Sequence, residues 1–269
     1  MKSDLAQLLK TASDSTQALN WMREYLQARI LAELQANGAM IPLAFHGGTA
    51  LRFFYQLPRY SEDLDFALER PGRGYDFLGY LEAIKAKLAL EGYQVAIKYA
   101  VEKVVQSAFL SFPGLLFEFE LSPMPDQNFS IKLEVDTRPP HGAGLNTNLI
   151  RHRELFLNLQ HHDKASLLAG KVHAILQRPY LKGRDIYDLV WYLSDRSWPD
   201  PNFQMLNNAL AQTGWEGAVL NDNNWKKILH EYLSVQKIQN ARQDVKPFLV
   251  RPEDIEYLAW EHISQLLAY

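Results

Sequence analysis

The sequence predicts an α/β fold in which a mixed sheet with its helices is followed by a mostly helical C-terminal half. Three observations predict this fold. Short apolar or alternating runs typical of strands fall between residues 41 and 136, with helical segments among them. A loop rich in proline and glycine spans about 137–150. From about residue 152 the apolar residues recur at helical spacing to the end of the chain.

The expected elements follow from apolar periodicity and from the turn residues that interrupt it. In the first half we expect helices at 3–37, 49–55 and 75–90, and strands at 41–45, 63–68, 93–111, 115–121 and 129–136. In the second half we expect helices at 163–177, 184–195, 203–212, 223–236 and 253–268. The change of pattern places a domain boundary near residue 150. Residues 1–150 would form the core with its N-terminal helices, and residues 151–269 a helical domain packed against it.

Composition excludes several classes of protein. The chain has 269 residues, of which 47% are hydrophobic and 22% charged, as in globular proteins. A formal net charge of −3 disfavours a general nucleic-acid coat protein. The absence of cysteine excludes disulfides, thiolate nucleophiles and cysteine-ligated zinc. Neither a signal-peptide core nor an apolar stretch of membrane-spanning length is present, so we expect a cytoplasmic protein without a membrane segment.

A pair of glycines stands between a predicted strand and a predicted helix. Gly47 and Gly48 would let the backbone approach a ligand closely, because neither residue carries a Cβ atom. The amide groups at the start of the next helix favour a phosphate, and Thr49 adds a hydroxyl donor. The alternative is a tight turn that binds nothing.

Two aspartates follow on the next predicted strand. Asp63 and Asp65 are two residues apart, so both carboxylates would emerge on one face while Leu64 faces the core. Adjacent carboxylates repel each other, and a divalent cation such as Mg²⁺ relieves that repulsion. The alternative is a solvated edge strand.

A third acidic position lies on the strand predicted at 129–136. Lys132, Glu134 and Asp136 share one face of this strand, and Leu133 and Val135 share the other. A carboxylate from this strand would complete a two-metal site. The alternation alone does not choose between Glu134 and Asp136. The glycine turn, the Asp-x-Asp strand and the later acidic strand together indicate nucleotidyl transfer, which depends on positioning and electrostatics.

These stretches resemble a known family. The segments GGTALR and RYSEDLDF look like the signature of AbiEii/AbiGii toxins, a MenT-containing branch of the DNA polymerase β-like nucleotidyltransferase superfamily. The downstream pattern of that family is also present, in the expected order: Lys171, Ala174, Arg178 and the segment Arg184-Asp185-Ile186-Tyr187-Asp188. The resemblance covers about residues 46–190 and implies a polymerase β-like core with a helical half that completes the active site.

The resemblance also implies residue roles. The nucleotide phosphates would be contacted by Gly47, Gly48, Thr49, Arg52, Arg59, Ser61 and Lys171. Asp63 and Asp65 would bind Mg²⁺ or Mn²⁺, with Glu134 favoured as the third ligand because family members have an acidic residue between two apolar ones there. Asp185 would lie beside Lys171 in the same pocket. Taken alone, Lys171 reads as a solvated helix lysine and Asp185 as a helix-terminal acid.

The expected function is therefore that of a toxin that transfers a nucleoside monophosphate from an NTP to an acceptor, with the 3′ end of tRNA expected. Basic segments such as 178–182 would guide an RNA backbone. The resemblance also implies a cognate antitoxin as a partner. Two alternatives stay open at this point. They are nucleotidylation of a protein hydroxyl, and a non-catalytic module that binds NTP or a partner on the same fold.

Overall fold

The protein, described here by a computed structural model over residues 2–268, divides into two compact units. The sheet unit runs to Phe54 and continues with Tyr60–Arg138 and Thr147–His161. The helical unit comprises Tyr55–Arg59, Pro139–Asn146 and the chain from His162 onward. Segments of the two units therefore alternate along the sequence.

A seven-stranded mixed sheet in the order β3-β4-β5-β2-β1-β7-β6 confirms the predicted α/β fold class. The strands are β1 (Leu43–His46), β2 (Leu64–Leu68), β3 (Ala96–Ala100), β4 (Val105–Phe112), β5 (Phe129–Asp136), β6 (Leu145–His152) and β7 (Leu155–His162). β1 pairs antiparallel with β2 and parallel with β7, and β2 pairs parallel with β5. β3, β4 and β5 form an antiparallel meander.

The two faces of the central strands differ in chemistry. Alternate residues of β5 are buried, from Phe129 to Val135, and the residues between them are part-buried and polar. Leu133 is the Cα partner of Leu64 in β2, and Val135 is the partner of Phe66, so the apolar residues of neighbouring strands share one face. We call the opposite face, which carries Lys132 and Glu134, the polar face of the sheet.

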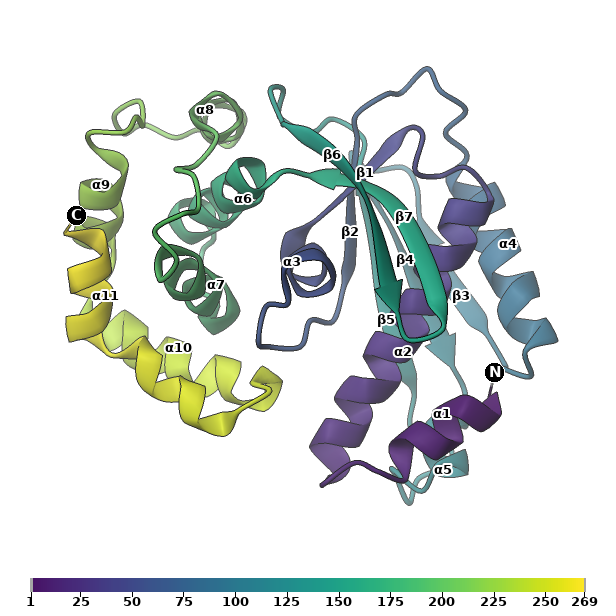
Figure 1. Cartoon of the computed structure of the whole chain (residues 1–269). Coiled ribbons are helices and arrows are strands. Elements are labelled where there is room, and N and C mark those ends of the chain that lie inside the picture. The colour runs from purple at the N-terminus through teal and green to yellow at the C-terminus, as the bar shows by residue number, and fades with distance from the viewer. Residues whose placement is uncertain (1, 269) are drawn as a thin grey trace. The chain divides into compact units, whose positions relative to one another are not determined.

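The helices of the sheet unit are α1 (Lys2–Leu9), α2 (Ser15–Ala36), α3 (Gly47–Tyr55), α4 (Phe77–Leu90) and α5 (Leu115–Glu118). Figure 1 shows α2 and α4 running beside the sheet, and the two helices contact each other. α3 packs Phe53 edge-on against Phe45 of β1, which in turn stacks on Phe66 of β2. These rings pack α3 against the central strands of the sheet.

The helical unit is built from α6 (Lys164–Gln177), α7 (Gly183–Leu193), α8 (Phe203–Gln212), α9 (Trp225–Tyr232), α10 (Val235–Val245) and α11 (Trp260–Leu267), with short 3₁₀ segments at Lys246–Phe248 and Pro252–Leu258. α10 packs closely on α7. A Cβ atom on Gly183 would lie 2.0 Å from the carbonyl oxygen of Ala241, so the first residue of α7 must be glycine for α10 to approach this far.

Several predicted elements in the first half are wrong in detail. The single helix expected at 3–37 is two helices, because Asp14 caps a new start by accepting from the Gln17 amide. The strand expected at 93–111 is the hairpin β3–β4. The strand expected at 115–121 is the single helical turn α5, which lies between left-handed residues at Gly114 and Glu120. Phe-Glu-Phe-Glu alternation over so short a run does not distinguish strand from helix.

The region around residue 150 is also corrected. The loop expected at 137–150 contains most of β6, an edge strand whose exposed residues carry no apolar alternation. The chain is not helical from residue 152, because Leu155, Leu157 and Leu159 alternate in β7. The helix expected at 223–236 ends at Tyr232, and α10 then follows from Ser234, whose hydroxyl caps it.

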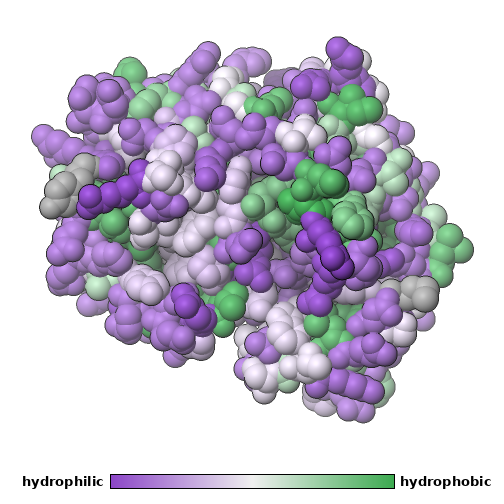
Figure 2. Space-filling model, in the orientation of Figure 1, coloured by the Kyte–Doolittle hydropathy of each residue, from purple (hydrophilic) through white to green (hydrophobic). Residues whose placement is uncertain are grey.

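Within residues 2–268, no helix is long and apolar enough to cross a membrane. The face drawn in Figure 2 is mostly hydrophilic, and several hydrophobic residues stand next to one another right of its centre. Some exposed apolar surface is ordinary for a folded protein.

The tight contact between α7 and α10 gives a test of the helical unit. We expect Gly183→Ala to lower the free energy of unfolding by about 2–3 kcal/mol, because the added methyl meets a backbone carbonyl that cannot rotate away. Gly170→Ala in α6 is the matched control, since nothing lies within 4 Å of its added Cβ. It should stabilise the protein by about 0.5–1 kcal/mol. Urea unfolding followed by circular dichroism measures both, and equal effects would contradict the proposed packing.

Candidate active site

The register of the central strands aligns two predicted carboxylates on the polar face. Asp65 in β2 is the Cα partner of Glu134 in β5. On its other side Asp65 is the partner of His46, the last residue of β1. All three residues are part-buried. The strands therefore place Asp65 in a polar row between a histidine and a second carboxylate.

The position of Asp65 and the backbone conformation at residue 47 both require a glycine there. Its φ of +76° lies in the left-handed region that favours glycine. A Cβ atom at this residue would lie 2.6 Å from the Asp65 Oδ2 atom. The close approach that this glycine permits in the structure is thus to a carboxylate of the protein itself, and contact of Gly47 and the buried Gly48 with phosphate stays a prediction.

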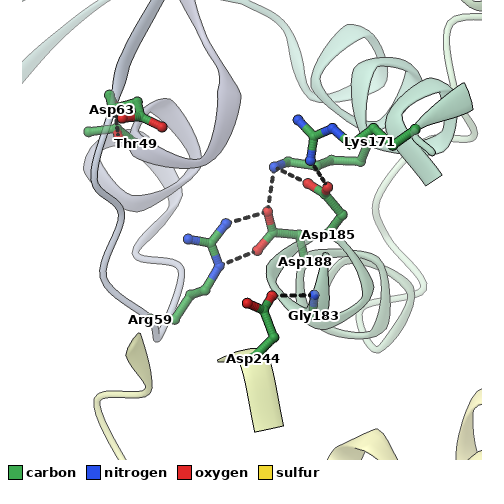
Figure 3. Close-up of polar contacts among 9 residues, drawn as sticks. Thr49, Arg59, Asp63, Lys171, Gly183, Asp185, Asp188 and Asp244 are labelled. Carbon is green, nitrogen blue, oxygen red and sulfur yellow. Dashed lines mark hydrogen bonds and ion pairs between the residues drawn. The ribbon is translucent and has the colours of Figure 1, made fainter. Parts of the chain in front are cut away.

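Asp63 lies just before β2 and is tied to the start of α3. The buried hydroxyl of Thr49 donates a hydrogen bond to the Asp63 carbonyl oxygen, as Figure 3 shows. The Thr49 hydroxyl therefore links the glycine turn to the acidic segment. Ser61 is held through its backbone as well, because its carbonyl accepts a hydrogen bond from the Gln27 amide at 3.1 Å. Phosphate contacts by Thr49 and Ser61 stay predictions.

The two candidates for the third carboxylate have different surroundings. Asp136 is the partner of Ala67, and its carboxylate accepts from the Arg138 amide at 2.9 Å, where it closes the turn after β5. Burial raises the pKa of Asp136, and the nearby Glu69 adds to this rise. Glu134 faces Asp65 directly and forms an ion pair with Lys132 at 2.8 Å. The register thus favours Glu134 as the companion of Asp65.

The acidic residues suit a metal that takes only part of its coordination from the protein. Among residues 2–268, no three side chains of histidine, aspartate or glutamate are arranged as a complete ligand set for a metal ion. Magnesium commonly binds proteins through one or two carboxylates, and substrate phosphates and water supply the remaining oxygens. Asp63, Asp65 and Glu134 offer oxygen ligands of that kind, so the donor chemistry fits Mg²⁺ or Mn²⁺.

Arg52 is held by residues that the sequence analysis did not identify. Its guanidinium pairs with Glu24 of α2 at 2.7 Å and lies over the ring of Tyr60. His152 of β6 also contacts Glu24, at 3.4 Å, and stacks on Phe53. Burial alone would raise the pKa of Glu24, but the hydrogen bond from His152 and the charge of Arg52 outweigh it and lower that pKa to about 2. Glu24 therefore stays charged and fixes the direction of Arg52.

In the helical unit, Lys171 of α6 lies between two carboxylates of α7. Its ammonium is 3.1 Å from Asp185 and 2.7 Å from Asp188. Dashed lines mark both contacts in Figure 3. Burial would lower the pKa of Lys171, but the charges of Asp188 and Asp185 raise it, so the ammonium stays protonated. The structure thus brings Lys171 and Asp185 together and adds Asp188 as a third member.

Arg59 belongs to this cluster of the helical unit. Its guanidinium is fully buried and donates to both oxygens of Asp188, at 2.7 and 2.6 Å. At the other end Arg178 pairs with Asp185. Burial would raise the pKa of Asp185, and the charges of Lys171 and Arg178 lower it. Cations and carboxylates therefore alternate through the cluster Arg59, Asp188, Lys171, Asp185 and Arg178.

The start of α7 carries a contact that sequence reasoning missed. The Gly183 amide donates to the Asp244 carboxylate of α10 at 2.7 Å (Figure 3). Lys182 precedes the helix, and its side chain makes no capping hydrogen bond. A carboxylate from a distant helix thus accepts from this buried N-terminal amide, while Asp185 and Asp188 bind cations. In the sequence, only the glycine before Arg184 hinted at this contact. Gly183 and Asp244 lie 61 residues apart, so no local pattern pairs them.

Aligned carboxylates on one face of a mixed sheet, with a glycine turn that makes room for one of them, agree with the class of nucleotidyltransferases. The chain belongs to the AbiEii family, because the family model described as nucleotidyl transferase AbiEii toxin of type IV toxin–antitoxin systems matches residues 29–260. The resemblance seen in the sequence is thereby confirmed. The non-catalytic alternative is not supported.

Solved structures show the same fold. MenT4, a nucleotidyltransferase toxin from Mycobacterium tuberculosis, is 14% identical with a TM-score of 0.54, over 100% of this chain and 89% of that chain. JHP933 from Helicobacter pylori is 17% identical with a TM-score of 0.53, over 93% of this chain and 90% of that chain. A structure described as a putative nucleotidyltransferase from H. pylori is 17% identical with a TM-score of 0.53, over 91% of this chain and 93% of that chain. No curated protein matches.

The lowered pKa of Glu24 predicts how stability depends on pH. A carboxylate whose pKa is lower in the folded state stabilises the fold above its ordinary pKa of 4.5, and loses that contribution as the pH falls toward about 2. Glu24→Gln should therefore lower the free energy of unfolding at pH 7 by at most about 3 kcal/mol. The difference from wild type should shrink between pH 4.5 and 2. Chemical unfolding across this range measures it, and a constant difference would contradict the assignment.

The buried pair of Arg59 predicts a second effect. Arg59→Met should lower the free energy of unfolding by about 3 kcal/mol, because it leaves Asp188 buried with only one cation, Lys171. Arg242→Met is the matched control in the same unit, since its partner Glu256 is 74% exposed. That change should have an effect below about 1 kcal/mol. Equal losses in urea unfolding would show that burial of the pair is unimportant.

Proposed function

We propose that this nucleotidyltransferase transfers a nucleoside monophosphate from an NTP to the 3′ end of tRNA in a reaction that depends on Mg²⁺ or Mn²⁺. The observation that supports it most directly is the register of Asp65 with Glu134 on the polar face, beside the glycine turn. A row of this kind can hold the cations that accompany a triphosphate. Membership of the AbiEii family agrees with an NTP donor.

We assign the metal to Asp63, Asp65 and Glu134. When bound, a divalent ion of this kind lowers the pKa of an attacking hydroxyl and offsets the charge of the departing pyrophosphate. The protein would contribute by position. Gly47 leaves room for Asp65, and the Thr49 hydroxyl holds the Asp63 backbone. The amides at the start of α3 would face the phosphates, as helix N-termini favour anions.

Lys171 is proposed to contact the triphosphate or the acceptor, with Asp185 as its positioning partner. Asp185 and Asp188 hold the Lys171 ammonium in a fixed place, and Arg59 and Arg178 balance those two carboxylates. The cluster therefore contains three cations and two carboxylates. A net positive charge of this kind attracts phosphate oxygens. Arg52, directed by Glu24, is proposed as a further phosphate contact from the sheet unit.

An RNA acceptor agrees with one surface of the helical unit. Tyr180 is 65% exposed between α6 and α7, and it lies between Arg178 and Lys182 in the chain. Exposed aromatic rings stack on unpaired bases, and flanking cations attract the backbone. A single-stranded RNA end offers both groups. We also propose a cognate antitoxin as partner, as type IV toxin–antitoxin systems imply, and a cytoplasmic reaction where tRNA and NTPs are found.

The proposal predicts that labelled nucleotide enters tRNA. Wild-type protein incubated with each α-labelled NTP, Mg²⁺ and total tRNA should transfer label, and EDTA should stop the transfer. Asp65→Asn should lower the rate by about 100-fold or more, because it removes one charge from the metal site and keeps the side-chain shape. Asp126→Asn is the control, since Asp126 is exposed in a loop of the same unit.

Three outcomes separate the alternatives. Label that nuclease removes, at the 3′ end of tRNA, supports the proposal. Label that protease removes, after cell lysate is added, would identify a protein hydroxyl as the acceptor instead. Transfer that EDTA and Asp65→Asn leave unchanged would contradict the metal site.

A further inference from the structure

Lys132 lies on the polar face of the sheet without an assigned function. Its ammonium is 2.8 Å from the Glu134 carboxylate, two residues along β5. It also lies 5.7 Å from the centre of the Phe109 ring, which belongs to the Cα partner of Lys132 in β4. The aliphatic stem thus rests beside an aromatic ring while the charge meets Glu134.

The position of Lys132 follows from the same register that aligns the acids. Glu134 is the partner of Asp65, so the Lys132 ammonium is bound to the carboxylate that faces Asp65. Neighbouring carboxylates destabilise each other's charged forms, and a cation nearby relieves this. Lys132 supplies a cation to the acidic row from within the protein.

The ion pair is open enough to be exchanged. The side chains of Lys132 and Glu134 are 31% and 26% exposed, whereas those of Arg59 and Asp188 are 2% and 0% exposed. A part-exposed pair is worth little in free energy, and a lysine on its flexible stem can leave its partner without an uncompensated buried charge. The Glu134 carboxylate can therefore exchange the Lys132 ammonium for a metal ion from solution.

We propose that Lys132 is an exchangeable counterion of the metal site. It pairs with Glu134 until a divalent ion takes that carboxylate, and its ammonium then contacts the triphosphate of the donor. This inference rests on the proposed function, since it assigns a residue to the same site. It gives Lys132 two effects of opposite sign, because the same ammonium competes with the metal and attracts the nucleotide.

The test measures both effects in Lys132→Met. Mn²⁺ binding followed by electron paramagnetic resonance, without nucleotide, should become about three-fold tighter, because a competing cation is lost. The KM for the NTP should rise about ten-fold, because a charged hydrogen bond to phosphate is lost. Because Lys132→Arg keeps the positive charge, its KM for the NTP and its Mn²⁺ affinity should both stay near the wild-type values.

Lys2→Met is the matched control. Lys2 pairs with Glu118 at 2.7 Å and lies 5.6 Å from the centre of the Tyr93 ring, so it reproduces the environment of Lys132 in α1 of the same unit. Neither Mn²⁺ affinity nor KM should change in this variant. Unchanged Mn²⁺ affinity in Lys132→Met, with transfer by the wild type intact, would overturn the role of Lys132 alone. A wild type that neither binds Mn²⁺ nor transfers nucleotide would overturn the proposed function with it.

Discussion

The register of β2 between β1 and β5 is the constraint on which the candidate site depends. It sets Asp65 opposite Glu134 on the polar face while Phe66 packs against Phe45 on the apolar one. A shift of one residue would expose the phenylalanine and bury the carboxylate, so the energy of the core fixes the chemistry of the surface. Gly47 belongs to the same constraint, because a side chain there would displace Asp65.

The protein uses charge in two ways. In the helical unit Arg59 and Asp188 are buried, and the side chain of Lys171 is only 13% exposed. If one of them left its partner, a charge would remain unpaired where little water reaches it. Such a cluster holds a lysine in one position. On the polar face Glu134 is part-exposed beside Asp65, and water or an incoming ion can replace its partner. A buried network of ion pairs can hold one side chain in a fixed orientation. A part-exposed carboxylate can bind a cation and release it again.

The sequence predicted which residues of the sheet unit lie together on the polar face, because that pattern is local. Gly47, Asp63 and Asp65 lie within 19 residues, and strand alternation alone puts Glu134 on the polar side of β5. The sequence alone could not show that Asp65 pairs with Glu134 and not with Asp136. The pairing of β2 with β5 joins residues that are far apart in the chain. The family resemblance supplied Lys171 and Asp185, which periodicity alone left as surface residues.

The contacts that the sequence did not predict share one cause. The pairing of Glu24 with Arg52, of Asp188 with Arg59 and of Asp244 with Gly183 depends on how distant elements pack. No local rule encodes such contacts. Edge strand β6 was missed for a related reason, since its exposed residues need no apolar pattern and its place comes from its neighbour in the sheet.

The alternation of the two units along the chain also bears on how this protein can evolve. Tyr55–Arg59 and Pro139–Asn146 belong to the helical unit although sheet-unit segments flank each of them. Arg59, which is buried against Asp188, lies only four residues before Asp63. A single genetic crossover therefore cannot replace one unit and leave the other whole. Exchange of one unit alone would need several crossovers, because each unit is assembled from three separate segments of the chain.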